Sequence, residues 1–155
     1  MKRNLLLVLV ISIVFSCSKE SDFPYSKGIN LYLNETFNLD IEDHNNETLV
    51  FLYLEYCRSC ITDALVLIDT MSVVSKEVKL FFIGDENAYP ENQIRIQSLK
   101  RKYNFEMDPN SNHYSFSSGI NEPLILKVGT GYIVDFAYIN DSSFDNSRNL
   151  IAGSE

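Results

Sequence analysis

A pair of cysteines set between a buried strand and a helix most constrains how this chain can fold. Residues 49–54 are almost all apolar, which is typical of a central strand covered on both faces. Cys57 follows this run within three residues, and Cys60 completes a C-x-x-C motif. The sequence therefore predicts Cys57 at the N-terminus of a helix and Cys60 one turn further in. The apolar face of that helix is Ile61, Ala64, Leu65, Ile68 and Met71, which follow helical spacing.

The later part of the chain continues this alternation of strands and helices. Residues 78–83 form a second buried strand, closed by a Gly-Asp pair. Pro90 can open a helix at its first turn, and three apolar residues give that helix a modest buried face. Residues 124–128 and 132–139 predict the two strands of a hairpin, joined by a Gly-Thr-Gly turn. Residues 108–119 are rich in Asn and Ser and predict a loop.

The segment before the first buried strand shows a different pattern. Residues 30–39 alternate apolar and polar side chains, which predicts one or two edge strands ahead of the main unit. The expected order is β-α-β-α-β-β with these leading strands and no internal repeat. A length of 155 residues suits one domain, and 45% apolar residues exclude a disordered chain.

The first residues of the chain predict an export signal. A short cationic start is followed by an apolar run at residues 5–15, which is too short for the ~20 residues of a membrane-spanning helix. Residues 14–17 (Val-Phe-Ser-Cys) resemble a bacterial lipobox, in which Cys17 would be lipidated and become the mature N-terminus. The alternative is an ordinary secretory signal with an incidental cysteine.

This start of the chain fixes the domain boundaries and the location that we expect. We expect a lipoprotein signal peptide at residues 1–16, a tether at residues 17–28 and one folded domain at residues 29–155. The protein would be lipid-anchored in the cell envelope through Cys17 and would face the periplasm or the cell surface, where disulfide chemistry is possible.

The charge balance and the cysteine count limit the function. Lys and Arg total 13 against 21 Asp and Glu, with no basic run, so nucleic acid is excluded as a partner. Cys57 and Cys60 are so close in the sequence that a structural disulfide between them would constrain little of the unfolded chain. Two cysteines also cannot complete a structural zinc site, and neither His44 nor His113 stands at a finger-like spacing. Redox exchange is the leading hypothesis that remains.

The combination of these elements resembles the thioredoxin fold, and within it the TlpA/ResA-like membrane-anchored thiol–disulfide oxidoreductases. The segments that carry the resemblance are residues 49–60, 105–109 and 121–129, within a stretch from residue 48 to residue 139. The resemblance implies that the domain at residues 29–155 is thioredoxin-like, with a three-layer α/β/α fold. We expect this chain to depart from it by extra N-terminal β strands and a shortened C-terminal helix.

The chemistry of the two cysteines follows from their predicted placement. A helix N-terminus stabilises a thiolate through its dipole and its free N–H groups, and Arg58 would add positive charge. We therefore assign Cys57 as the nucleophile. Cys60 would be the resolving thiol that attacks the mixed disulfide and releases the substrate.

Four further residues are candidates through the resemblance. Pro123 resembles the cis-proline of the family, and the residue before it, here Glu122, would pair with bound substrate. A trans edge-strand proline is the alternative. Tyr56 stands where the family commonly has Trp and could form an aromatic rim for a substrate peptide. Asp63 stands where the anchored reductases often have Glu, and it either tunes thiol titration or is a solvated helix residue.

The resulting hypothesis is a thiol–disulfide oxidoreductase without cofactor or metal. Its partners would be exported cysteine-containing proteins and a membrane or periplasmic thiol donor. One rival function is Cu(I) delivery through Cys57, Cys60 and His113, although such proteins typically show C-x-x-x-C. Another rival is a non-catalytic lipoprotein that keeps the fold as a binding module. A peroxiredoxin fits less well, because the Thr-x-x-Cys loop is missing.

Overall fold

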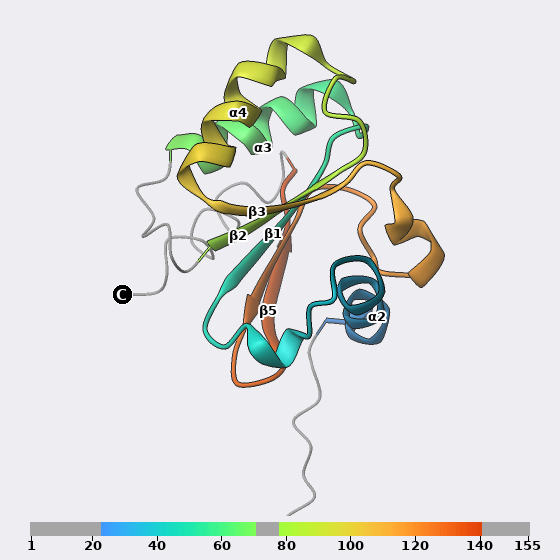
Figure 1. Cartoon of the computed structure of the whole chain (residues 1–155). Helices are drawn as coiled ribbons and strands as arrows, with labels where there is room; N and C mark the ends of the chain where they lie inside the picture. Colours follow the sequence, from blue (N-terminus) through green and yellow to red (C-terminus); the bar gives the residue numbers. More distant parts are fainter. Residues whose placement is uncertain (1–22, 71–77, 141–155) are drawn as a thin grey trace, which may run out of the picture.

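Five strands form one mixed sheet in the computed structural model, which describes residues 23–70 and 78–140. The sheet has the order β3-β2-β1-β4-β5 (Figure 1). The first three strands are parallel, β4 is antiparallel to β1, and β5 is antiparallel to β4. The strands are β1 (Thr48–Tyr53), β2 (Val78–Ile83), β3 (Asn104–Asp108), β4 (Leu124–Val128) and β5 (Ile133–Tyr138).

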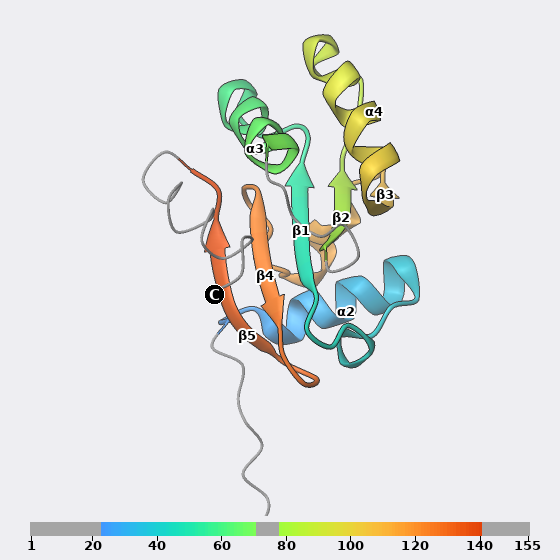
Figure 2. The same ribbon diagram turned by 90° about the vertical axis from the view of Figure 1, so that its left-hand side faces the viewer.

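Helices cover both faces of this sheet. Helices α3 (Arg58–Thr70) and α4 (Gln93–Lys102) lie on one face, and α2 (Ser26–Phe37) lies on the other (Figures 1 and 2). Three short 3₁₀ turns complete the described elements: η1 (Ile41–Asp43), η2 (Pro90–Asn92) and η3 (Asn112–Phe116). The result is the predicted three-layer α/β/α architecture.

The central strand β1 explains why the chain needs two covering layers. Its successive side chains point to opposite faces of the sheet. Val50 and Leu52 belong to the apolar core beneath α3 and α4, whereas Leu49 and Phe51 belong to the core beneath α2. All four side chains are fully buried. The apolar run that predicted a doubly covered strand is therefore confirmed.

The leading edge strands predicted at residues 30–39 are wrong, because this segment belongs to helix α2. Ile29, Tyr32 and Leu33 are spaced for one helix face, and all three are buried against the sheet. The helix ends at Asn38, which adopts a left-handed conformation and donates its N–H to the Asn34 carbonyl at 2.9 Å. A window of ten residues fits both the two-residue period of a strand and the 3.6-residue period of a helix. The helix forms because its apolar face covers the face of the sheet opposite to α3 and α4.

The described fold also starts earlier than the boundary expected at residue 29. Phe23 is only 1% exposed, and α2 begins at Ser26. Gly28 brings α2 close to the end of η3, since a Cβ at this position would stand 2.3 Å from the Ser117 carbonyl oxygen. The first turn of α2 is therefore part of the folded domain.

The edge strand β3 was not predicted. Its five residues are mostly exposed or half-buried, and Phe105 is 40% exposed. Short, partly polar strands of this kind show little two-residue periodicity in the sequence, and they gain their hydrogen bonds from the neighbouring strand, here β2.

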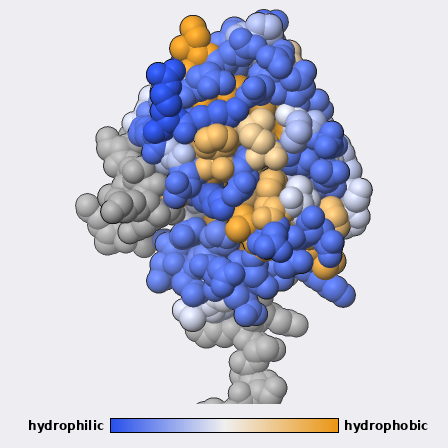
Figure 3. Space-filling view, in the orientation of Figure 1, coloured by the Kyte–Doolittle hydropathy of each residue, from blue (hydrophilic) through white to orange (hydrophobic). Residues whose placement is uncertain are grey.

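The face seen in Figure 1 is largely hydrophilic, with apolar side chains gathered across its middle (Figure 3).

Three predictions fall outside the described residues: the signal peptide at residues 1–16, the lipidated Cys17 and the shortened C-terminal helix. Within residues 23–70 and 78–140, no helix is long and apolar enough to cross a membrane.

Candidate active site

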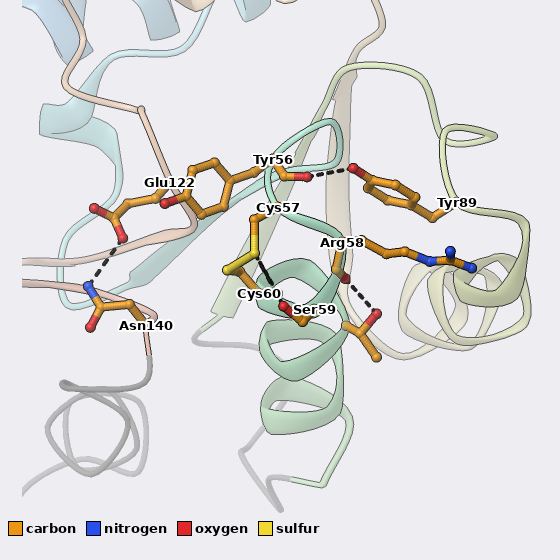
Figure 4. The surroundings of a disulfide bond; sticks show 9 residues. Tyr56, Cys57, Arg58, Ser59, Cys60, Tyr89, Glu122 and Asn140 are labelled. Atoms are coloured by element: carbon orange, nitrogen blue, oxygen red, sulfur yellow. Dashed lines mark hydrogen bonds between the residues drawn. A yellow bond between two sulfur atoms is a disulfide. The ribbon is translucent and has the colours of Figure 1, made fainter.

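Cys57 and Cys60 form a disulfide at the junction of β1 and α3, as their predicted placement requires (Figure 4). The S–S distance is 2.10 Å and the Cα atoms are 5.2 Å apart. Cys57 immediately precedes α3, and its carbonyl accepts the N–H of Ile61 at 3.0 Å, which closes the first helical turn. Cys57 is exposed, whereas Cys60 is half-buried. A visiting molecule therefore meets the Cys57 sulfur first.

Two donors converge on the Cys57 sulfur. The backbone N–H of Cys60 donates to Cys57 Sγ at 3.2 Å, and the Ser59 hydroxyl lies 3.3 Å from the same atom. After reduction, these donors and the helix N-terminus would stabilise a thiolate at Cys57. Ser59 was not among the predicted site residues. Its signal in the sequence is a hydroxyl side chain two residues after a cysteine at a helix start, where it can reach back to the sulfur.

Arg58 is placed differently from the expectation that it adds positive charge beside Cys57. Its side chain extends away from the disulfide (Figure 4) and forms an ion pair with Glu91 of η2. The hydrogen bond between them raises the pKa of Arg58 and lowers the pKa of Glu91. The positive charge of Arg58 is thus largely balanced by a carboxylate contributed from another element.

The connection between β2 and α4 braces the loop that carries the cysteines. The Tyr89 hydroxyl donates to the Tyr56 carbonyl at 2.8 Å (Figure 4), and the Thr62 hydroxyl is 3.2 Å from Asn92 Oδ1. Together with the pair between Arg58 and Glu91, these contacts join the starts of α3 and α4. Tyr56 itself is half-buried.

The expected cis-proline is wrong. None of the peptide bonds that the structure describes is cis, so Pro123 follows Glu122 through a trans bond. Trans is favoured by about 0.5–1 kcal/mol for an X–Pro bond, and nothing in the local sequence opposes it. Pro123 is buried and its carbonyl accepts the N–H of Ile139 at 2.7 Å. Glu122 is half-buried and accepts a hydrogen bond from Asn140 at 3.1 Å (Figure 4).

Asp63 lies on the exposed side of α3, one turn beyond Cys60. Among the residues that the structure describes, the Asp63 side chain has no hydrogen-bond or ion-pair partner. This placement agrees with the solvated helix residue that was the alternative for this position.

His113 lies in an aromatic environment. It is 1% exposed, with the rings of Tyr53 and Tyr114 at centroid distances of 5.0 and 4.0 Å. Burial lowers its pKa. In the described part of the chain, no three His, Cys, Asp or Glu side chains are grouped so as to hold a metal ion. The three-ligand copper site of Cys57, Cys60 and His113 is therefore not formed.

Tyr56, the residue expected to form an aromatic rim, belongs to a set of tyrosines whose other members were not predicted. The ring of Tyr53 lies 6.4 Å from Tyr56 and 5.9 Å from Tyr114, and the hydroxyls of Tyr53 and Tyr114 are hydrogen-bonded. Burial and this bond raise the pKa of Tyr53. With Tyr89, these residues form what we call the tyrosine cluster. They come from three separate segments, so no local pattern could have grouped them.

The comparisons with known proteins show a similarity to solved structures. No family model matches the sequence, and no curated protein matches it. The chain is similar to the solution structure of a putative protein disulfide isomerase from Bacteroides thetaiotaomicron. The two share 14% sequence identity over 71% of this chain and 74% of the other, with a TM-score of 0.46.

Proposed function

We propose that the protein is a thiol–disulfide oxidoreductase that exchanges its Cys57–Cys60 disulfide with cysteines of other proteins. One observation carries the proposal: an exposed disulfide at the start of α3, with the Cys60 N–H and the Ser59 hydroxyl directed at Cys57 Sγ. A structural crosslink between neighbouring helical turns would constrain little. A redox disulfide needs the exposure and the thiolate stabilisation that this one has.

The exchange proceeds in two steps in either direction. In oxidation, a substrate thiolate attacks Cys57 Sγ, the Cys57–Cys60 bond breaks, and Cys60 leaves as a thiolate that takes a proton. A second substrate thiolate then attacks the substrate sulfur of the mixed disulfide and releases Cys57. The substrate loses two electrons and two protons, and the protein gains them. In reduction, Cys57 attacks the substrate disulfide and Cys60 resolves the mixed disulfide.

The location of this activity is proposed from the sequence alone. The lipobox-like residues 14–17 support a lipid anchor at Cys17 in the cell envelope, with the protein facing the periplasm or the cell surface. The substrates would then be exported cysteine-containing proteins, and a membrane or periplasmic thiol donor would restore the dithiol. The TlpA/ResA-like kinship of the chain is part of the same proposal.

The test is the reactivity of the two thiols in the reduced protein. We expect Cys57 to be alkylated about tenfold faster than Cys60 at neutral pH, because Cys57 is exposed and faces two donors. Equal rates, or a faster Cys60, would contradict the assigned roles. Equilibration with glutathione then gives the direction of exchange. A protein that fails to exchange, and in which Cys57→Ser has no consequence, would instead be a non-catalytic binding module.

A further inference from the structure

A partner that exchanges with Cys57 has to cover the residues around it, so their chemistry selects the partner. Cys57 stands between Tyr56, a member of the tyrosine cluster, and Arg58, the first residue of α3. Tyr114 is 62% exposed, and Tyr53, Tyr56 and Tyr89 are each half-buried. Tyr56 directly precedes the reactive Cys57, and its ring lies 6.4 Å from that of Tyr53, which continues the aromatic surface to Tyr114 at 5.9 Å.

The charges around this surface are mainly negative. Glu55 follows β1 directly, is exposed, and is held by the backbone N–H of Asp85 at 3.2 Å. It lies close enough to Tyr53 to contribute to the raised pKa of that hydroxyl. Among the residues that the structure describes, neither Glu55 nor Asp85 has a cationic partner. Arg58 is the only cation within residues 54–62, and it is already paired with Glu91.

We propose that the tyrosine cluster and Glu55 form a docking surface for cysteine-containing polypeptides with Lys or Arg beside the reacting cysteine. The inference rests on the proposed function and names its substrate class. The carboxylate of Glu55 attracts the cationic group, and the tyrosine rings accept its aliphatic stem and its charge through cation–π contact. The net charge of −8 attracts such a partner and repels an acidic one before contact.

The test compares matched peptides that differ only in the residues flanking one cysteine. Each peptide carries Lys, Gln or Glu beside its cysteine and is supplied as a mixed disulfide. The rate at which it exchanges with the reduced full chain is measured. At about 20 mM salt, where the screening length is long, we expect the Lys-flanked peptide to react about tenfold faster than the Glu-flanked one. The ratio should shrink at about 0.5 M salt, because the charges are then screened.

A pair of charge variants separates the surface from the overall charge. Glu55→Gln should lower the ratio of Lys-flanked to Gln-flanked rates by about threefold at low salt. Glu42→Gln removes the same charge from η1, which precedes β1 at the end opposite to Cys57, and should leave the ratio as it is. Equal effects of the two variants would overturn the docking surface.

Exchange with a neutral disulfide distinguishes a wrong docking surface from a wrong oxidoreductase assignment. Exchange with the neutral hydroxyethyl disulfide, together with equal rates for the three peptides, would overturn the docking surface and leave the oxidoreductase in place. No exchange with the neutral disulfide would overturn the oxidoreductase, and the docking surface with it.

Discussion

Removing one hydroxyl tests whether α2 is an integral part of this domain. Tyr32 of α2 is fully buried, and its hydroxyl donates to Asp108 Oδ2 at 2.9 Å, at the end of β3. Tyr32→Phe keeps the ring and removes this single bond. A hydrogen bond to a charged acceptor contributes about 1.5–3 kcal/mol to the free energy of unfolding. With a urea dependence of about 2 kcal/mol per molar, a loss of about 2 kcal/mol lowers the unfolding midpoint by about 1 M.

The assay is urea unfolding followed by circular dichroism, with Tyr114→Phe as the control. The Tyr114 hydroxyl is also hydrogen-bonded, to Tyr53, but the residue is 62% exposed, so its loss should cost less than about 0.5 kcal/mol. A Tyr32→Phe midpoint within about 0.2 M of the wild type, at an unchanged slope, would refute the reasoning.

Three further predictions concern pH and steric fit. Burial and Asp108 raise the pKa of Tyr32, so the unfolded chain loses this proton above about pH 10 while the folded chain keeps it. The free energy of unfolding should then fall by about 1.4 kcal/mol per pH unit above that point, and less steeply in Tyr32→Phe, as urea midpoints would show. Burial lowers the pKa of His113, so below about pH 6.5 the unfolded chain binds a proton that the folded chain does not. Melting temperatures should therefore fall between pH 7.5 and about pH 5, and a His113→Gln variant that keeps the full wild-type decline would contradict this. Gly28→Ala should destabilise by about 1–3 kcal/mol despite the better helix propensity of Ala, since its Cβ would meet the Ser117 carbonyl. A Gly28→Ala variant as stable as the wild type in thermal unfolding would count against this close approach.

The central elements were predictable because their patterns are local. Residues 49–54 and 78–83 are apolar on both faces, and the helix after Cys57 shows one clear apolar stripe. The structure places β1, β2 and α3 accordingly. Cys57 and Cys60 were therefore located correctly at the strand-to-helix junction.

The errors came from features that tertiary contacts decide. The segment at residues 30–39 fits a strand and a helix equally, and only its burial against the free face of the sheet selects α2. Strand β3 is held by its pairing with β2, which no local pattern shows. The partner of Arg58 is Glu91, 33 residues away, and the trans bond before Pro123 depends on how the chain enters β4. None of these could be determined from neighbouring residues.

The bracing between α3 and α4 bears on how a redox state can be communicated. Three separate contacts, made by Arg58, Thr62 and Tyr89, hold the cysteine turn from the β2–α4 side. None of them involves a sulfur atom, so all three can persist when the disulfide opens. We expect oxidised and reduced forms to share one backbone shape. A partner that tells them apart would then have to sense the thiols themselves, and the molecule would act as a rigid electron carrier with no conformational signal to pass on.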